Sequence, residues 1–214
     1  MLMTIPAAAR RLRNRSHRAS RGVALLTVVI MLLVITLLAL AGSRLALDGK
    51  RAARNQRDYE IAYMAAEAAL RDAELDIQGA SGTSNRSQIF SPESSQGFIA
   101  GDCNTGTAPT SPYQGLCDTF ANTGEPIWNT IDWTTSIGNK TVEYGTFTGR
   151  SFATGSGLTP SRRPRYLIEL LRDNAIGSDA SGPSRYMYRI TAVGFGPNDT
   201  TRAMVQSTYR LSGY

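Results

Sequence analysis

An uninterrupted apolar run from Val23 to Ala41 constrains the fold of this chain more than any other feature of its sequence. The run reads VALLTVVIMLLVITLLALA, carries no charge, and has only Thr27 and Thr36 as polar members. A helix rises about 1.5 Å per residue, so roughly 20 apolar residues span the hydrocarbon core of a bilayer. We therefore expect a membrane-spanning helix over residues 23–42.

Two other interpretations of the apolar run stay open when only the residues are considered. Ala39-Leu40-Ala41 has the small-x-small form that signal peptidase prefers, which would make the run a cleaved secretory signal. The run is longer than the apolar region of about 7–15 residues that is usual in such signals, and this argues against cleavage there. The other interpretation is a transmembrane helix that serves only as an anchor.

Basic charge is concentrated in front of the apolar run. Residues 1–22 hold six arginines and no acidic residue. Taking these six from the 23 Lys and Arg leaves 17, which equals the 17 Asp and Glu, so the chain from Val23 onward is formally neutral. The positive-inside rule places this leader, residues 1–22, in the cytoplasm and the C-terminal domain in the periplasm. A neutral domain argues against nucleic acid as a partner.

No catalytic motif is recognisable in the chain. The only histidine, His17, lies in the leader, so the later domain has none for a Ser-His-Asp triad or a His-ligated metal site. The sequence also lacks a Gly-x-Ser-x-Gly elbow, a P-loop and a His-Glu-x-x-His motif. We expect no enzymatic activity, no cofactor and no metal. A membrane-anchored periplasmic enzyme or binding protein remains an alternative class.

The only two cysteines, Cys103 and Cys117, lie in a segment rich in loop-forming residues. Their separation does not match the Cys-x-x-Cys spacing of zinc and redox sites. On the oxidising periplasmic side of a bacterial inner membrane we expect them to form a structural disulfide. The alternative is two separate buried thiols.

A second helical signal follows the apolar run, from Ser43 to about Gln78. The segment 59–77 is rich in Ala, Leu and Glu, which are strong helix formers, and Gly79-Ala80-Ser81-Gly82 is expected to end the helix. Spacings of three and four residues predict an apolar face made of Tyr59, Ala62, Tyr63, Ala66, Ala69, Leu70, Ala73 and Ile77. A second set of positions is not expected to form an apolar face: Ile61, Ala65, Ala68, Ala69, Asp72 and Asp76.

Residues 79–214 are expected to form one compact periplasmic domain. Residues 79–160 are loop-like, with Trp128 and Trp133 as expected core anchors. Alternating or apolar runs predict strands at 166–171, 185–193 and 203–211, with a turn between the last two. The predicted fold class is α+β, with the long N-terminal helix packed against an antiparallel β-sheet and a disulfide-containing loop region.

The junction Arg21-Gly22-Val23, where the basic leader meets the apolar run at a glycine, resembles the type III signal of type IV prepilins. The segments RGVALLTVVIMLLVITLLALA and NQRDYEIAYMAAEAALRDAE are similar to the PilX class of minor pilins. Near the C-terminus PRYLIELL, YRITAVGFG and VQSTYRL resemble the same class. The resemblance covers both ends of the chain, and residues 80–160 resemble no family.

This resemblance implies roles for three residues near the N-terminus. A prepilin peptidase would cut after Gly22 and methylate the new N-terminus at Val23, and the apolar run would be kept as the first half of a long helix. In this family the first mature residue is usually Phe or Met and the fifth is usually Glu. Val23 and Thr27 occupy these positions here.

The resemblance also implies a function. The protein would be a minor pilin that helps to prime assembly and to form the tip complex of type IV pili, supporting twitching motility and adhesion. Its partners would be other minor pilins, the major pilin, the prepilin peptidase and a large tip adhesin. It would cross the inner membrane once and be incorporated into the pilus. The alternative within the same leader-bearing group is a minor pseudopilin of type II secretion.

Overall fold

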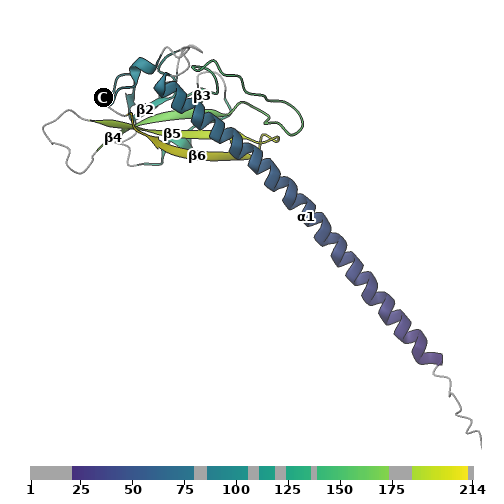
Figure 1. Ribbon diagram of the computed structural model, residues 1–214. Helices are drawn as coiled ribbons and strands as arrows, with labels where there is room; N and C mark the ends of the chain where they lie inside the picture. Colours follow the sequence, from purple (N-terminus) through teal and green to yellow (C-terminus); the bar gives the residue numbers. More distant parts are fainter. Residues whose placement is uncertain are drawn as a thin grey trace, which may run out of the picture. The chain divides into compact units, whose positions relative to one another are not determined.

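The computed structural model of the protein describes residues 21–79, 86–105, 111–118, 124–135, 139–173 and 185–211 (Figure 1). The chain divides into two compact units, the N-terminal unit Met1–Arg51 and the globular unit Ala52–Tyr214. Helix α1, Arg21–Gln78, contributes residues to both units. Residues 1–20 of the predicted leader lie outside the described residues.

In the N-terminal unit, all described residues belong to α1. Every side chain described there, from Val23 to Arg51, is exposed. The most apolar 18-residue window of α1 has a mean hydropathy of 3.1, and none of that window is buried. Among the described residues, α1 is the one helix that is long and apolar enough to cross a membrane, judged by length and composition. The expected membrane-spanning segment is therefore helical and fully available to lipid.

The globular unit is built on a mixed six-stranded sheet. The order across the sheet is β1 (Ile99–Ala100), β2 (Leu116–Asp118), β4 (Arg165–Arg172), β5 (Tyr186–Phe195) and β6 (Arg202–Tyr209). Strand β3 (Val142–Glu143) also pairs with β4. The short helix η1 (Ser87–Ile89) lies between α1 and β1, and α2 (Ile127–Thr130) lies between β2 and β3.

The antiparallel prediction is confirmed for the C-terminal strands and wrong for two short ones. Strands β4, β5 and β6 form an antiparallel meander, and β3 is antiparallel to β4. Strand β2 is parallel to β4, and β1 is parallel to β2. A parallel neighbour needs a long crossover connection, and the loop-rich segment between β2 and β4 supplies one. The sheet is therefore mixed.

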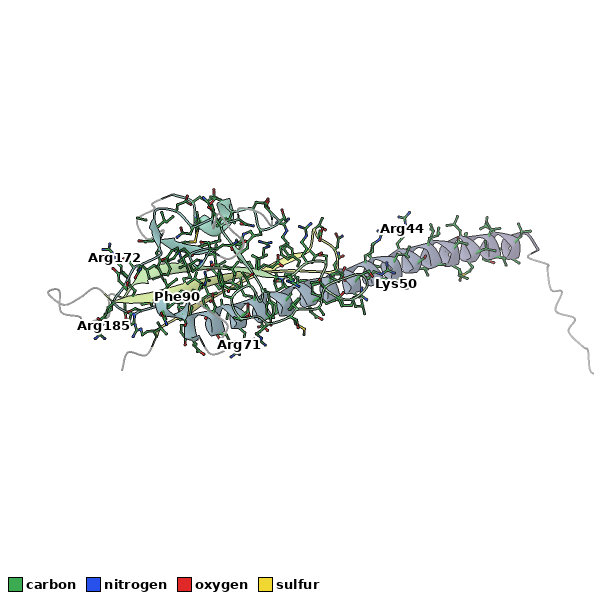
Figure 2. All side chains as sticks on the ribbon, turned by 90° about the horizontal axis from the view of Figure 1, so that it is seen from above. Arg44, Lys50, Arg71, Phe90, Arg172 and Arg185 are labelled. Carbon is green, nitrogen blue, oxygen red and sulfur yellow. A yellow bond between two sulfur atoms is a disulfide. The ribbon has the colours of Figure 1, made fainter. Side chains whose placement is uncertain are left out.

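Both faces of the central strand β4 are buried, which explains why its sequence is a continuous apolar run rather than an alternating one. One face packs on α1 and forms the larger core, which includes Tyr166, Ile168 and Ile190. The opposite face carries a smaller core that includes Leu167 and Phe195. Figure 2 shows the sheet between α1 and the loop segments that cover this second face.

The globular part of α1 lies very close to strand β5. A Cβ atom at Gly194 would lie 2.1 Å from the carbonyl oxygen of Ala62 and 2.3 Å from the backbone nitrogen of Ala66. Two small residues on the helix and a glycine on the strand therefore let backbone approach backbone. The helix ends as expected, since Gly79 follows it with a φ of 69° and its N–H bonds the carbonyl of Leu75 at 2.9 Å.

The predicted apolar face of α1 is partly right. The five residues confirmed as buried are Ala62, Ala66, Ala69, Ala73 and Ile77. Tyr59 and Tyr63, predicted on this face, are exposed. Ala65, Asp72 and Asp76, which were not expected on an apolar face, are buried against the sheet. The contact face is therefore rotated from the tyrosines toward the two aspartates.

The second core is closed by the disulfide and by a tryptophan. Cys103 and Cys117 are bonded to each other and are both buried, so the disulfide prediction is confirmed. Trp133 is buried beside them, and its indole N–H donates to the carbonyl oxygen of Trp128 at 3.0 Å. Trp128 packs on the same core while partly buried. Both tryptophans are thus core anchors, as predicted.

We expect replacement of both Cys103 and Cys117 by alanine to lower the free energy of unfolding of the globular unit by about 3 kcal/mol. The reason is that the bridge closes a loop of roughly 15 residues and so restricts the unfolded chain. Denaturant unfolding of the full chain in detergent, followed by tryptophan fluorescence, measures the loss. Alkylatable thiols in protein taken from the periplasmic side would contradict the bridge itself.

Candidate functional site

The residues that the sequence singles out for processing lie at the start of α1. The described part of α1 spans Arg21–Gln78, and the bond between Gly22 and Val23 lies close to its N-terminal end. The Val23 side chain is exposed, and the first 18 residues after it include no acidic group. Gly22, Val23 and Thr27 are therefore close in space because they lie on two successive turns of one helix.

The two polar side chains of the apolar run are satisfied within the helix. The Thr27 hydroxyl donates to the Ala24 carbonyl oxygen at 2.9 Å, and the Thr36 hydroxyl donates to the Leu33 carbonyl oxygen at 2.8 Å. In a lipid environment an unbonded hydroxyl is costly, and these local bonds remove that cost. Thr27 thus presents no charge and no unbonded hydroxyl within the apolar run.

A buried ion pair connects α1 to the loop that follows it. The Arg86 guanidinium donates from Nε to the Oδ1 and Oδ2 atoms of Asp76 at 3.0 and 2.8 Å, and from Nη2 to Oδ2 at 2.5 Å. Both side chains are fully buried. The Tyr166 hydroxyl, from β4, donates to Asp76 Oδ2 at 2.8 Å. One carboxylate therefore joins the helix, the loop and the central strand.

The environment of Arg86 explains how a guanidinium can be buried. Its Nη1 donates to the carbonyl oxygen of Gln114 at 2.6 Å and to that of Pro112 at 3.3 Å. The guanidinium carbon lies 3.8 Å from the centre of the Phe147 ring and 5.6 Å from that of Phe90. Hydrogen bonds in the plane and rings at its faces replace the lost water.

A second carboxylate, Asp72, lies one turn before Asp76 on the same face of α1. It accepts hydrogen bonds from the Gly145 N–H at 2.8 Å and from the Thr148 hydroxyl. Burial raises the pKa of Asp72, and these two hydrogen bonds oppose that rise. Burial also raises the pKa of Tyr166 well above its usual value, and the negative charge of Asp76 adds to this. The tyrosine is therefore a fixed hydrogen-bond donor at physiological pH.

The opposite face of the sheet carries another buried carboxylate. Glu169 on β4 accepts two hydrogen bonds from Arg189 on β5, at 2.8 and 2.9 Å, and the two residues are direct cross-strand neighbours. The Arg189 guanidinium carbon lies 4.4 Å from the centre of a Trp128 ring. The pair fixes the register of the two strands beneath the tryptophan.

These polar clusters hold elements together, and no described residue arrangement points to catalysis. Within the described ranges no group of three or more His, Cys, Asp or Glu side chains is placed to hold a metal ion. In the part of the chain that the structure describes, the three fully buried carboxylates each serve a structural element: Asp72 and Asp76 fix the helix, and Glu169 fixes the sheet. What the structure builds is a helix locked onto a sheet.

The sequence reasoning did not find the Asp72 and Asp76 contacts. One signal was present, because each aspartate lies seven residues after an alanine that proved to be buried, Ala65 and Ala69. Residues seven apart lie within about 20° of one another on a helix. That periodicity places both carboxylates on the buried face, but their polarity argued against it.

Two family models match this chain. The model described as "PilX N-terminal" matches residues 21–71, and the model described as "Type IV pilus assembly protein PilX C-term" matches residues 99–211, more than half of the 214 residues. No curated protein and no solved structure gave a significant match.

An exposed apolar helix that continues into a helix-on-sheet domain with a disulfide fits a membrane-anchored pilin. The two family matches make the assignment specific, because they cover both the apolar helix and the sheet. The chain belongs to the PilX family of type IV pilus assembly proteins.

Proposed function

We propose that this protein is a minor pilin that primes assembly of type IV pili and forms part of the complex at the pilus tip, supporting twitching motility and adhesion. The observation that carries the proposal is the match of pilus-assembly family models to both ends of a chain whose α1 is apolar and exposed. The C-terminal match favours a pilus over the alternative of a type II secretion pseudopilus, because the family is described by pilus assembly.

The proposed location is the inner membrane, with the globular unit in the periplasm before the subunit enters the pilus. The basic leader supports this orientation. The disulfide supports it as well, since such bonds persist in oxidising compartments. The proposed partners are the other minor pilins, the major pilin, the prepilin peptidase and a large tip adhesin.

We expect the mature protein to begin at Val23 with a methylated amine, and we expect a Gly22→Phe variant to keep residues 1–22. The glycine leaves room at the bond to be cut, and a bulky side chain removes that room. Intact mass measurement of both proteins from membranes checks this. Piliation counted by electron microscopy, in a strain lacking the gene, should be restored by wild type and not by Gly22→Phe.

The same mass measurement tests the alternative of a secretory signal, because the two peptidases leave different products. Cleavage after Ala41 would give a protein that begins at Gly42 and lacks the apolar run, and this result would contradict the proposed function. A matched control is Gly42→Phe, which lies outside the proposed cleavage site and should not alter the mass of the mature protein beyond the substitution itself.

Thr27 supports a place at the leading end of the fibre. In the pilin family the fifth-residue glutamate of an incoming subunit is thought to meet the N-terminal amine of the subunit ahead. An unpaired charge at that apolar depth is costly, and pairing offsets much of the cost. Thr27 has no charge, and its hydroxyl already bonds Ala24. This subunit supplies no partner for an amine ahead of it, while its own amine at Val23 can still be paired by the next subunit.

We therefore expect immunogold label to appear at pilus ends or on initiation complexes rather than along shafts. Immunogold labelling of the major pilin is the control, because it shows whether antibody can reach subunits along the shaft. A Thr27→Glu variant should change piliation little, because a carboxylate with no subunit ahead makes no new contact. Uniform labelling of shafts, or a strong gain in incorporation for Thr27→Glu, would contradict placement at the tip.

A further inference from the structure

The N-terminal unit carries a cluster of cations that the proposed function does not use. Arg44, Lys50 and Arg51 are all exposed on α1, and we call these three residues the basic collar. Arg44 and Lys50 project from different sides of the helix (Figure 2). At 100° per residue Arg44 and Lys50 stand roughly 120° apart, whereas Arg51 lies within about 20° of Arg44, so the positive charge covers about a third of the helix circumference.

The basic collar has little acidic compensation in its own unit. Asp48 is the only acidic residue between Val23 and Arg51. Its carboxylate lies 3.8 Å from the Arg51 guanidinium, and the two side chains are 72% and 79% exposed. An ion pair this open to solvent contributes little and is easily exchanged for another partner. The collar therefore keeps a net positive charge that is available to an anion.

Exposed leucines lie among these cations. Leu45 is 73% exposed and Leu47 is 54% exposed, and both lie within one helical turn of Arg44. The expected membrane-spanning segment ends at residue 42, so along the helix axis Arg44 lies about 3 Å beyond it, and Lys50 and Arg51 lie about 12–14 Å beyond it. The headgroup layer of each leaflet is about 5–7 Å thick. Arg44 thus lies at headgroup depth, and the long side chains of Lys50 and Arg51 extend back toward the polar layer.

We propose that the basic collar binds the phosphate groups of anionic phospholipids in the leaflet through which α1 leaves the membrane. The proposal rests on the membrane anchoring that the proposed function includes. Guanidinium groups match phosphate oxygens with two parallel hydrogen bonds, and an ammonium adds a point charge. The sequence continues with Arg54 and Arg57 before the next acidic residue, Asp58, so the positive charge does not end abruptly at the collar.

The full chain reconstituted in phosphatidylcholine vesicles tests this inference. Trace phosphatidylglycerol or phosphatidylcholine carrying an acyl-chain spin label reports, by its motionally restricted fraction, how strongly each lipid associates with the helix. We expect phosphatidylglycerol to associate at least about threefold more strongly than phosphatidylcholine at low salt, since each cation near an anionic headgroup favours binding. The preference should shrink in about 1 M salt, where the Debye length falls to about 3 Å.

A triple variant, Arg44→Gln, Lys50→Gln and Arg51→Gln, should bring the association ratio close to one. The matched control removes the same formal charge from exposed arginines of the globular unit, by Arg71→Gln, Arg172→Gln and Arg185→Gln. These three residues are labelled in Figure 2. The control variant should keep the full preference for phosphatidylglycerol, because its substitutions leave the basic collar intact.

Three results would overturn the inference. They are no lipid preference in wild type, an unchanged preference in the collar variant, and an equal loss in both triple variants. If the collar variant lost piliation while wild type showed no lipid preference, the cations would bind carboxylates of neighbouring subunits instead. Extraction of wild type from membranes by alkaline carbonate would contradict the anchoring itself, which separates failure of the proposed function from failure of this inference.

Discussion

Replacement of Asp76 by asparagine is expected to lower the free energy of unfolding of the globular unit by about 3–5 kcal/mol. The substitution keeps the size of the side chain and removes its charge. Arg86 would remain fully buried with its positive charge and would lose the Asp76 carboxylate, and Tyr166 would lose a charged acceptor. Denaturant unfolding of the full chain in detergent, followed by the fluorescence of Trp128 and Trp133, measures the change.

The size of this effect comes from the buried charge that remains after the substitution. The net contribution of the intact ion pair to the free energy of unfolding is much smaller. Replacing a buried ion pair by apolar groups is often neutral, whereas removing one member is strongly destabilising. We therefore expect Arg86→Met alone to be costly, because it removes the guanidinium that pairs with the buried Asp76 carboxylate. The double variant Asp76→Asn with Arg86→Met should lose clearly less stability than the sum of the two single variants, with a coupling of about 1–3 kcal/mol.

Glu74 provides the matched control on the same helix. Its carboxylate lies 3.8 Å from the Arg71 guanidinium, and Arg71 is well exposed. Glu74→Gln should cost no more than about 0.5 kcal/mol, because a half-buried carboxylate that pairs at 3.8 Å with an exposed arginine gains little from the pair. Equal losses for Asp76→Asn and Glu74→Gln, or strict additivity in the double variant, would contradict the role assigned to the buried pair.

The sequence predicted those parts of the fold that depend on local pattern. Strands β4, β5 and β6 each have at least eight residues and a clear apolar or alternating pattern, so their positions followed from the chain alone. Strands β1 and β2 have two and three residues, which is too short for periodicity to show. Their parallel pairing depends on a crossover through the loop-rich segment, and no local signal encodes it.

The residues of the candidate site were likewise predicted only where the sequence signal is local. Gly22, Val23 and Thr27 were found from the sequence because a leader and an apolar run are contiguous features. The partners of Asp76 were not found, since Arg86 lies past the end of the helix and Tyr166 is 90 positions away. A buried carboxylate looks like a surface residue until the cation and the hydroxyl that satisfy it are placed beside it in three dimensions.

Replacement of Gly194 by valine is expected to cost at least about 4 kcal/mol, more than the usual 1–3 kcal/mol for an overpacked core. The obstacle is backbone rather than a side chain that can turn away. A Cβ atom at this position would lie 2.1 Å from the Ala62 carbonyl oxygen and 2.3 Å from the Ala66 nitrogen. Accepting it would push α1 away from β5 and would also strain the Asp72 and Asp76 contacts of the same helix face.

Gly124 supplies the control for this substitution, because a Cβ atom there would meet nothing within 4 Å. Gly124→Ala should leave the free energy of unfolding within about 0.5 kcal/mol of wild type, as is usual for a surface change. Gly194→Ala should already lose most of the stability that Gly194→Val loses, since the first added carbon makes the clash. A Gly194→Ala protein as stable as Gly124→Ala would show that α1 can leave the sheet without cost, and would contradict the locked helix-on-sheet arrangement.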